Sequence, residues 1–215
     1  NIYQYNTTTD TWDNVTRGTT VEDCEDAWDA SANVTCTADT TYKLRGSTSA
    51  KMAIAAAFTT GIAATEVVSD MDLSACTALH FWIRSSIALT AGQVQVGVSE
   101  TVTMGGTPLW VDVPALEAGV WTPCCVDATF TGYNNVISTG LNVVTDVGVA
   151  GADIYIDDVK GVTRYTGDGD NLWSTATMND TFIATNGIDQ PQKYTGSGMF
   201  TALATALATG SITTS

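Results

Sequence analysis

The sequence predicts an all-β fold, and three patterns support that prediction. Residues 79–84 alternate apolar with polar side chains, and residues 93–98 do the same, which is the period of a half-buried strand. The apolar run Ile154–Ile156 is typical of a third, buried strand. Clusters of Gly, Asn, Asp and Thr separate these runs at short intervals, as they do in antiparallel sandwiches and barrels.

The segment from Ser49 to Phe58 conflicts with this pattern, because its alanine content is typical of a helix. Its larger side chains, Met52, Ile54 and Phe58, nevertheless all fall on even-numbered positions, which is the alternation of a strand. A Thr-Thr-Gly sequence at 59–61 then ends the run early. We therefore expect a strand here too.

Composition restricts the function. The formal net charge is −15, from 23 acidic and 8 basic residues, and the basic residues form no run. Phosphate binding needs clusters of Lys and Arg, so we expect no nucleic-acid partner. No apolar run approaches the ~18 residues of a membrane span, so we expect no membrane insertion. The chain lacks an initiator Met and ends without a closing element, so we expect either a removed signal or a piece of a longer protein.

Catalytic motifs are lacking from the sequence, and we expect no enzyme activity. There is no nucleophile elbow, zinc-protease motif or phosphate loop. The one histidine, His80, falls in the middle of a predicted strand, where a structural role is expected. Two carboxylate pairs, at 22–23 and 25–26, have the chemistry of a glycosidase. In so acidic a chain we expect such pairs to be solvated.

The five cysteines contain no Cys-x-x-Cys pair, which argues against a zinc site. Two alternatives remain open. Cys24 and Cys36 form a disulfide, or all five are small buried apolar residues in a reduced protein.

One predicted strand carries residues suited to contact with a glycan or a partner. If the odd-numbered residues of 79–83 face the core, the even-numbered ones face away, and the glutamines of the next strand share their face. A Trp among Arg, His and Gln suits sugar stacking, and it equally suits a subunit contact. A third alternative is that a loop covers Trp82. The candidates are His80, Trp82, Arg84, Gln93, Gln95 and, in a predicted loop, Trp110.

Five segments in a fixed order make residues 19–163 resemble a jelly-roll carbohydrate-binding module. The resemblance implies a two-sheet β-sandwich whose first and last strands pair. It spans some 145 residues, and each segment alone is weakly specific. The segments are "VEDCEDAW" at 21–28, "STSAKMAI" at 47–54, "DLSACTALHFWIRSS" at 72–86, "VWTPCCVDA" at 120–128 and "ADIYIDDVKGV" at 152–162.

The flanks 1–18 and 164–215 resemble other proteins. "YQYNTTTDTWDNVT" looks like the end of a kelch-type propeller blade, and we expect a hairpin there. "DTFIATNGIDQPQKYTGSGMFTAL" is similar to blade segments of phage virion and tail proteins. This implies partial, propeller-blade-like β modules at both ends of the jelly roll.

Taken together, the resemblances imply a structural or decorating component of a phage virion or tail, located in the virion and carrying a glycan-adhesion domain. Its partners would be other virion subunits, copies of itself, or cell-surface or extracellular polysaccharide. The alternative is a secreted, extracellular carbohydrate-binding module attached to an enzyme outside this chain.

Two adjacent carboxylates, Asp157 and Asp158, follow the buried run 154–156, where an unpartnered carboxylate is costly. Similar jelly-roll modules carry a structural calcium, and the resemblance places it between Glu22 and Asp157. Asp23, Asp158 and loop carbonyls would complete the oxygen ligands. The alternative is that Asp157 accepts backbone hydrogen bonds and no metal binds. Because neighbours on a strand point to opposite faces, we expect one of the two aspartates in solvent.

Overall fold

The computed structural model describes two compact units of the chain. One unit is Gly18–Thr163, and the other is formed by Asn1–Arg17 and Arg164–Ser215. Apart from one 3-10 turn, η1 (Val102–Met104), all the regular structure of the described residues is strand, so the all-β prediction is confirmed. No described helix is long and apolar enough to cross a membrane. The described residues are 3–6, 11–14, 18–148, 151–163, 174–185, 191–194 and 201–203.

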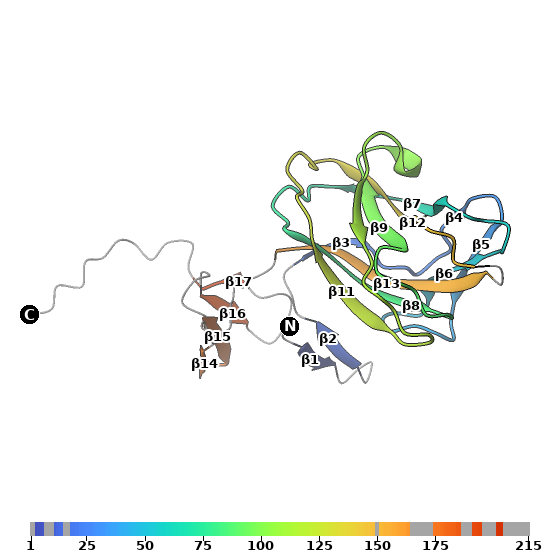
Figure 1. The fold of residues 1–215 in the computed structure, drawn as a ribbon. Helices are drawn as coiled ribbons and strands as arrows, with labels where there is room; N and C mark the ends of the chain where they lie inside the picture. Colours follow the sequence, from blue (N-terminus) through green and yellow to red (C-terminus); the bar gives the residue numbers. More distant parts are fainter. Residues whose placement is uncertain are drawn as a thin grey trace, which may run out of the picture. The chain divides into compact units, whose positions relative to one another are not determined.

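Gly18–Thr163 is a sandwich of two antiparallel sheets, as the sequence predicts (Figure 1). The six-stranded sheet has the order β11-β8-β13-β6-β5, with β3 also paired to β13. Its strands are β3 (Gly18–Glu22), β5 (Val34–Asp39), β6 (Ser49–Ile54), β8 (Ala78–Ser85), β11 (Thr122–Asp127) and β13 (Ala152–Val162). The five-stranded sheet has the order β10-β9-β12-β7-β4. Its strands are β4 (Asp29–Ala30), β7 (Gly61–Met71), β9 (Val94–Ser99), β10 (Leu109–Asp112) and β12 (Val136–Val143).

The core lies between the sheets and follows from the alternation read in the sequence. Phe81 and Ile83 of β8 and Val94 and Val96 of β9 are almost wholly buried in one apolar cluster. Burial of this apolar surface is the main favourable contribution to folding. The five cysteines are all free thiols, as the second alternative expects, but only Cys24 and Cys124 are buried.

Strand β13 occupies the centre of the six-stranded sheet. It pairs with β8 from Ile154 to Val162, with β6 over its N-terminal half, and with β3 at its C-terminal end. Gly18 lies opposite Val162, so the two ends of the domain are neighbours. This is the pairing of first and last strands that the sequence predicts.

The alanine-rich segment forms strand β6, as expected, but the strand is shorter than the pattern. It ends at Ile54, and the Phe58 amide donates to the Ala55 carbonyl at 2.9 Å to close a turn. Sheet pairing on both sides, with β5 and β13, satisfies the backbone and overrides the helical propensity of alanine.

The second unit contains a hairpin and a small sheet. Strands β1 (Tyr3–Asn6) and β2 (Thr11–Asn14) form the hairpin expected near the N-terminus. A four-stranded antiparallel sheet has the order β14-β15-β16-β17. The predicted Asn-Gly and Gly-Ser-Gly turns lie outside the described residues. The strands are β14 (Ser174–Met178), β15 (Thr181–Thr185), β16 (Gln192–Tyr194) and β17 (Thr201–Ala202).

We predict that residues 18–163 fold without the flanks, because both sheets and their shared core lie within this range. A protein of residues 18–163 should unfold in one cooperative transition, measured by circular dichroism in urea with near- and far-ultraviolet signals compared. Gradual, non-coincident transitions of the two signals would contradict this.

Candidate functional site

The residues predicted for glycan or partner contact lie on two different sheets. His80, Trp82 and Arg84 are on β8 of the six-stranded sheet, whereas Gln95 and Trp110 are on β9 and β10 of the five-stranded sheet. The expectation of one shared face is therefore wrong. Strands β8 and β9 follow each other in the chain, but the connection between them crosses from one sheet to the other.

His80 does not reach solvent. It is 2% exposed, and burial lowers its pKa to about 4, so the ring is neutral at pH 7. The charged groups that further influence this pKa are Asp158, Lys160 and Arg45, and the last of these belongs to the loop between β5 and β6. This segment, residues 40–48, is called the cover loop below. The expected contact role of His80 is thus wrong, because its side chain is almost wholly buried.

Trp110 lies across the backbone of the five-stranded sheet. It is opposite Gly97 on β9, which is opposite Gly140 on β12. A Cβ at residue 97 would overlap Cε3 of the Trp110 indole, so only glycine leaves room for the ring. Met104 of η1 occupies the equivalent position over Gly140. The indole is half-buried, with the rest of its surface open.

A row of polar side chains runs beside Trp110 on the same face. Asp112, Gln95 and Asn142 are register partners across β10, β9 and β12, two residues along from the Trp110 row. The Gln95 amide nitrogen donates to Asp112 Oδ1 at 2.8 Å, and the Asn142 amide nitrogen donates to Gln95 Oε1 at 3.0 Å. These bonds fix the orientation of the Gln95 amide. Each group retains further donor or acceptor capacity.

Gln93, in contrast, forms hydrogen bonds to the backbone of two loop residues. Its Nε2 donates to the Asp146 carbonyl at 2.8 Å, and its Oε1 accepts from the Thr90 amide at 3.0 Å. The polar neighbours of Gln95 beside Trp110 are Asp112 and Asn142 instead of Gln93. Neither was identified from the sequence, because their role depends on cross-strand register. The alternation of "LWVD" and "LNVV" would have placed them outward, but without a common neighbour.

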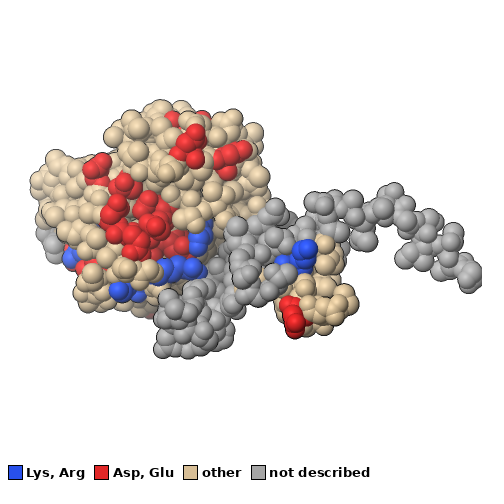
Figure 2. Space-filling model, turned by 180° about the vertical axis from the view of Figure 1, so that it is seen from behind, with Lys and Arg blue, Asp and Glu red and all other residues tan. Residues whose placement is uncertain are grey.

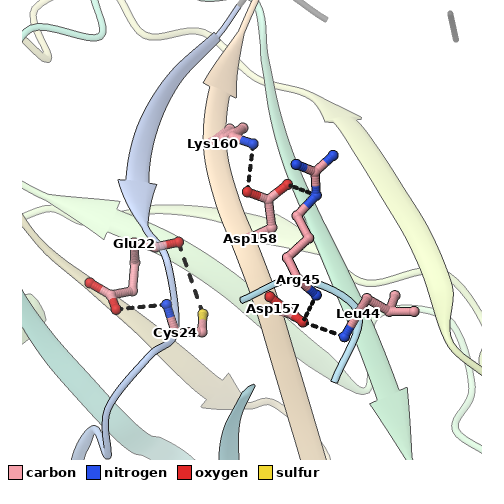
Figure 3. Close-up of polar contacts among 7 residues, drawn as sticks. All are labelled: Glu22, Cys24, Leu44, Arg45, Asp157, Asp158 and Lys160. Atoms are coloured by element: carbon pink, nitrogen blue, oxygen red, sulfur yellow. Dashed lines mark hydrogen bonds and ion pairs between the residues drawn. The ribbon is translucent and has the colours of Figure 1, made fainter. Parts of the chain in front are cut away.

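Asp157 secures the cover loop to the centre of the six-stranded sheet (Figure 3). Its Oδ2 accepts hydrogen bonds from the backbone amides of Leu44 at 2.7 Å and Arg45 at 2.9 Å. Backbone hydrogen bonds of this kind are what the alternative for Asp157 expects, whereas metal binding is a separate question that they leave open. The side chain is fully buried, and burial raises its pKa to about 6 despite the two amide donors, which lower it.

Asp158 is buried as well, and the expectation that one of the two aspartates is solvated is wrong. The register between β13 and β8 shifts between Asp157 and Lys160, and Asp158 has a left-handed backbone with φ of 56°. This bulge interrupts the alternation of side chains. The Asp158 carboxylate forms ion pairs with Arg45, whose Nε lies at 2.9 Å, and with Lys160 (Figure 3). These two cations compensate its charge.

The four carboxylates predicted to bind calcium do not converge. Glu22 Oε1 accepts from the Cys24 amide at 2.9 Å, Asp23 Oδ1 accepts from the Glu25 amide, and Asp158 holds two cations. Asp157 Oδ1 is the one buried carboxylate oxygen of this set with neither a hydrogen bond nor an ion pair. In the part of the chain that the structure describes, no three His, Cys, Asp or Glu side chains are placed to hold a metal ion. This arrangement does not fit the predicted ligand set.

Asp and Glu side chains gather in a patch on one face of the domain, with Lys and Arg along part of its border (Figure 2). The negative charges of Asp26 and Glu66 raise the pKa of Glu22, and the charge of Asp29 raises that of Glu66. These carboxylates therefore lie near one another. Burial, and then these neighbours, raise the pKa of Glu22 to about 7. This patch repels anionic ligands.

Comparison with known proteins gives only distant similarities. No family profile and no curated protein matches the chain. Three solved structures illustrate the similarities, which concern the fold alone. The family 11 carbohydrate-binding module of the cellulosomal cellulase Lic26A-Cel5E of Clostridium thermocellum is 10% identical, with a TM-score of 0.48 over 72% of this chain and 100% of that chain. The family 30 module of cellulase Cel9D-Cel44B of that organism is 13% identical, with a TM-score of 0.40 over 71% and 97%. An exo-beta-agarase is 12% identical, with a TM-score of 0.48 over 71% of this chain, which spans 26% of the agarase chain.

We predict that Asp157→Ala lowers the free energy of unfolding by about 2–4 kcal/mol, because it leaves two half-buried amides of the cover loop without an acceptor. Asp157→Asn should cost less, since one amide oxygen can accept both bonds. Urea unfolding of the full chain measures this, with Asp153→Ala on the same strand as the partly exposed control. Equal effects of Asp157→Ala and Asp153→Ala would contradict the anchoring role.

Calcium binding stays a prediction with a direct test. If a calcium ion binds the folded chain, millimolar calcium should raise the melting temperature and a chelator should lower it. Asp157→Asn should remove most of this response. An unchanged melting temperature under both treatments, with no metal found by elemental analysis, would leave Asp157 with its backbone role alone.

Proposed function

We propose that Gly18–Thr163 is a non-catalytic carbohydrate-binding domain whose glycan site is the Trp110 face of the five-stranded sheet. One observation carries the proposal: the half-buried indole lies on Gly97 beside the hydrogen-bonded row Asp112–Gln95–Asn142. The open surface of an indole stacks on the C–H face of a sugar ring. The amide and carboxylate groups match sugar hydroxyls, which both donate and accept.

The chemistry of this face favours a neutral sugar. Its three polar side chains combine two amides with one carboxylate, and they are already oriented by the bonds among them. A pre-oriented row loses little side-chain entropy when a ligand binds. A neutral polysaccharide presents a hydroxyl at nearly every ring carbon and so meets the row without adding charge.

Binding without cleavage fits the same residues. Glycoside hydrolysis needs two carboxyl groups on either side of the scissile bond. The polar row holds one carboxylate, Asp112, which accepts a hydrogen bond from Gln95. His80 is buried and neutral on the other sheet and reaches no substrate.

The setting we propose for this domain is a phage virion or tail protein with structural or decorating function, as the flanking segments imply. The adjacency of the domain ends supports an insertion, because Gly18 lies opposite Val162 and a chain can leave and re-enter another β module at one point. The second unit, built from both flanks, is itself strand-rich. A secreted module linked to an enzyme outside this chain is the alternative.

The setting can be tested on particles. Antibodies against residues 18–163 should label purified virions at sites repeated around a symmetric assembly. Recovery of the chain only as a secreted protein covalently continuous with an enzyme domain would favour the alternative.

We predict that Trp110→Ala weakens binding of the full chain to a neutral oligosaccharide, selected on a glycan array, by about tenfold. Tenfold corresponds to ~1.4 kcal/mol, and a stacked aromatic ring contributes about that much. Isothermal titration calorimetry measures the change. Trp82→Ala, which removes a half-buried Trp from the other sheet, is the matched control and should bind as the unmodified chain does. Loss of binding in Trp82→Ala but not in Trp110→Ala would place the glycan site on the six-stranded sheet and contradict the proposal.

A further inference from the structure

Every Lys and Arg of Gly18–Thr163 lies on the outer side of the six-stranded sheet. Three are on its strands β6, β8 and β13, and two are in the cover loop. The rest of the domain is acidic, within a chain whose formal net charge is −15. The distribution concentrates positive charge on the face opposite to that of Trp110. The five residues are Lys43, Arg45, Lys51, Arg84 and Lys160.

Four of these cations are already engaged. Arg45 and Lys160 pair with Asp158, and Lys51 Nζ lies 2.8 Å from Asp153. Lys43 Nζ donates to the Ser47 carbonyl at 2.7 Å, within the cover loop.

Arg84 is different. Among the described residues it forms no ion pair, and the one hydrogen bond that its guanidinium donates there runs from Nε to the Gly119 carbonyl at 3.1 Å. The four N–H bonds of its two Nη atoms remain for a ligand.

Two tyrosine rings lie near the Arg84 guanidinium. Its Cζ lies 3.8 Å from the centroid of the Tyr42 ring and 5.1 Å from that of Tyr155. The ring of Trp121 lies edge-on to Tyr155, at 6.5 Å between centroids. Tyr42 is 41% exposed and Trp121 is half-buried, so both offer open ring surface. A cation stacked on a ring keeps its orientation, and its planar edge is held ready for an acceptor.

Besides Asp157 and Asp158, two carboxylates lie near Tyr155, namely Asp39 and Asp153, and both already have partners. Asp39 Oδ1 accepts from the backbone amides of Thr41 and Tyr42, which shapes the start of the cover loop. Asp153 holds Lys51. Neither forms an ion pair with Arg84 in the described residues.

We propose that Arg84, with Tyr42 and Trp121, forms a second saccharide site, for a carboxylated sugar residue within an otherwise neutral polysaccharide. The carboxylate of a hexuronic acid takes the bidentate bond from the Nη groups, and its pyranose ring lies on an exposed aromatic ring. The ligand carries isolated acidic residues, because the acidic remainder of the domain repels a polymer charged at every residue. This site lies on the other sheet and does not rest on the Trp110 site.

The test compares cellobiouronic acid with cellobiose, which differ by one carboxylate, using the full chain and isothermal titration calorimetry. We expect the acid to bind about tenfold more tightly, corresponding to ~1.4 kcal/mol, and the difference to shrink at high salt. The methyl ester of the acid should bind as cellobiose does. Arg84→Gln should abolish the preference, and Arg84→Lys should reduce it, because Lys lacks the planar fork.

Matched controls distinguish this site from a general effect of positive charge and from the Trp110 site. Lys43→Gln removes the same charge from the same side of the sheet and should keep the preference. Trp110→Ala should keep it too, so failure of either site is recognised separately. If the unmodified chain binds the acid no more tightly than its methyl ester, the proposal is overturned without any variant. Retention of the preference in a folded Arg84→Gln protein overturns it equally.

Discussion

The carboxylate of Asp157 organises one whole side of this domain. It reaches from the central strand β13 to two backbone amides of the cover loop, and that loop supplies Tyr42 and Arg45. The opposite end of the loop is held independently. Both Glu25 carboxylate oxygens accept from the Ser47 amide, and the Thr48 hydroxyl donates to the Cys24 carbonyl. A buried carboxylate is tolerated because its two amide bonds offset part of the cost of desolvation. Without this anchor the position of Tyr42 against the Arg84 guanidinium would not be fixed.

Much of the fold was readable because alternation and burial are local signals. The runs at 79–84 and 93–98 formed strands β8 and β9, and the resemblance correctly paired the first strand with the last. Sheet membership was not readable in the same way. Whether a chain turns back in its own sheet or crosses to the other depends on packing of the whole sandwich, which no local pattern records. His80 and Gln95 were therefore placed together, although they lie on opposite sides of the domain.

The candidate sites illustrate the same limit at the level of side chains. Trp110 and Gln95 were identified by residue type, but Gly97 and Asn142 acquire meaning only through the register of three strands. Arg84 was selected for a face shared with His80, and the rings that contact its guanidinium belong to Tyr42 and Tyr155, both distant in sequence. The bulge at Asp158 broke the alternation rule on which the solvated carboxylate was predicted. The chemistry of single residues was thus predictable, whereas which side chains the fold brings together was not.

The antiparallel pairing of β3 with β13 has a mechanical consequence. Gly18 begins β3 and Val162 ends β13, and the two are opposite each other. A force that draws the two ends of the domain apart would load the hydrogen bonds of this strand pair one after another, from Gly18 inward, as a zip opens. Bonds loaded in sequence yield at lower force than bonds loaded together in shear. Tension along the chain would therefore open this seam first, while the five-stranded sheet, which holds Trp110, pairs with neither of the two loaded strands.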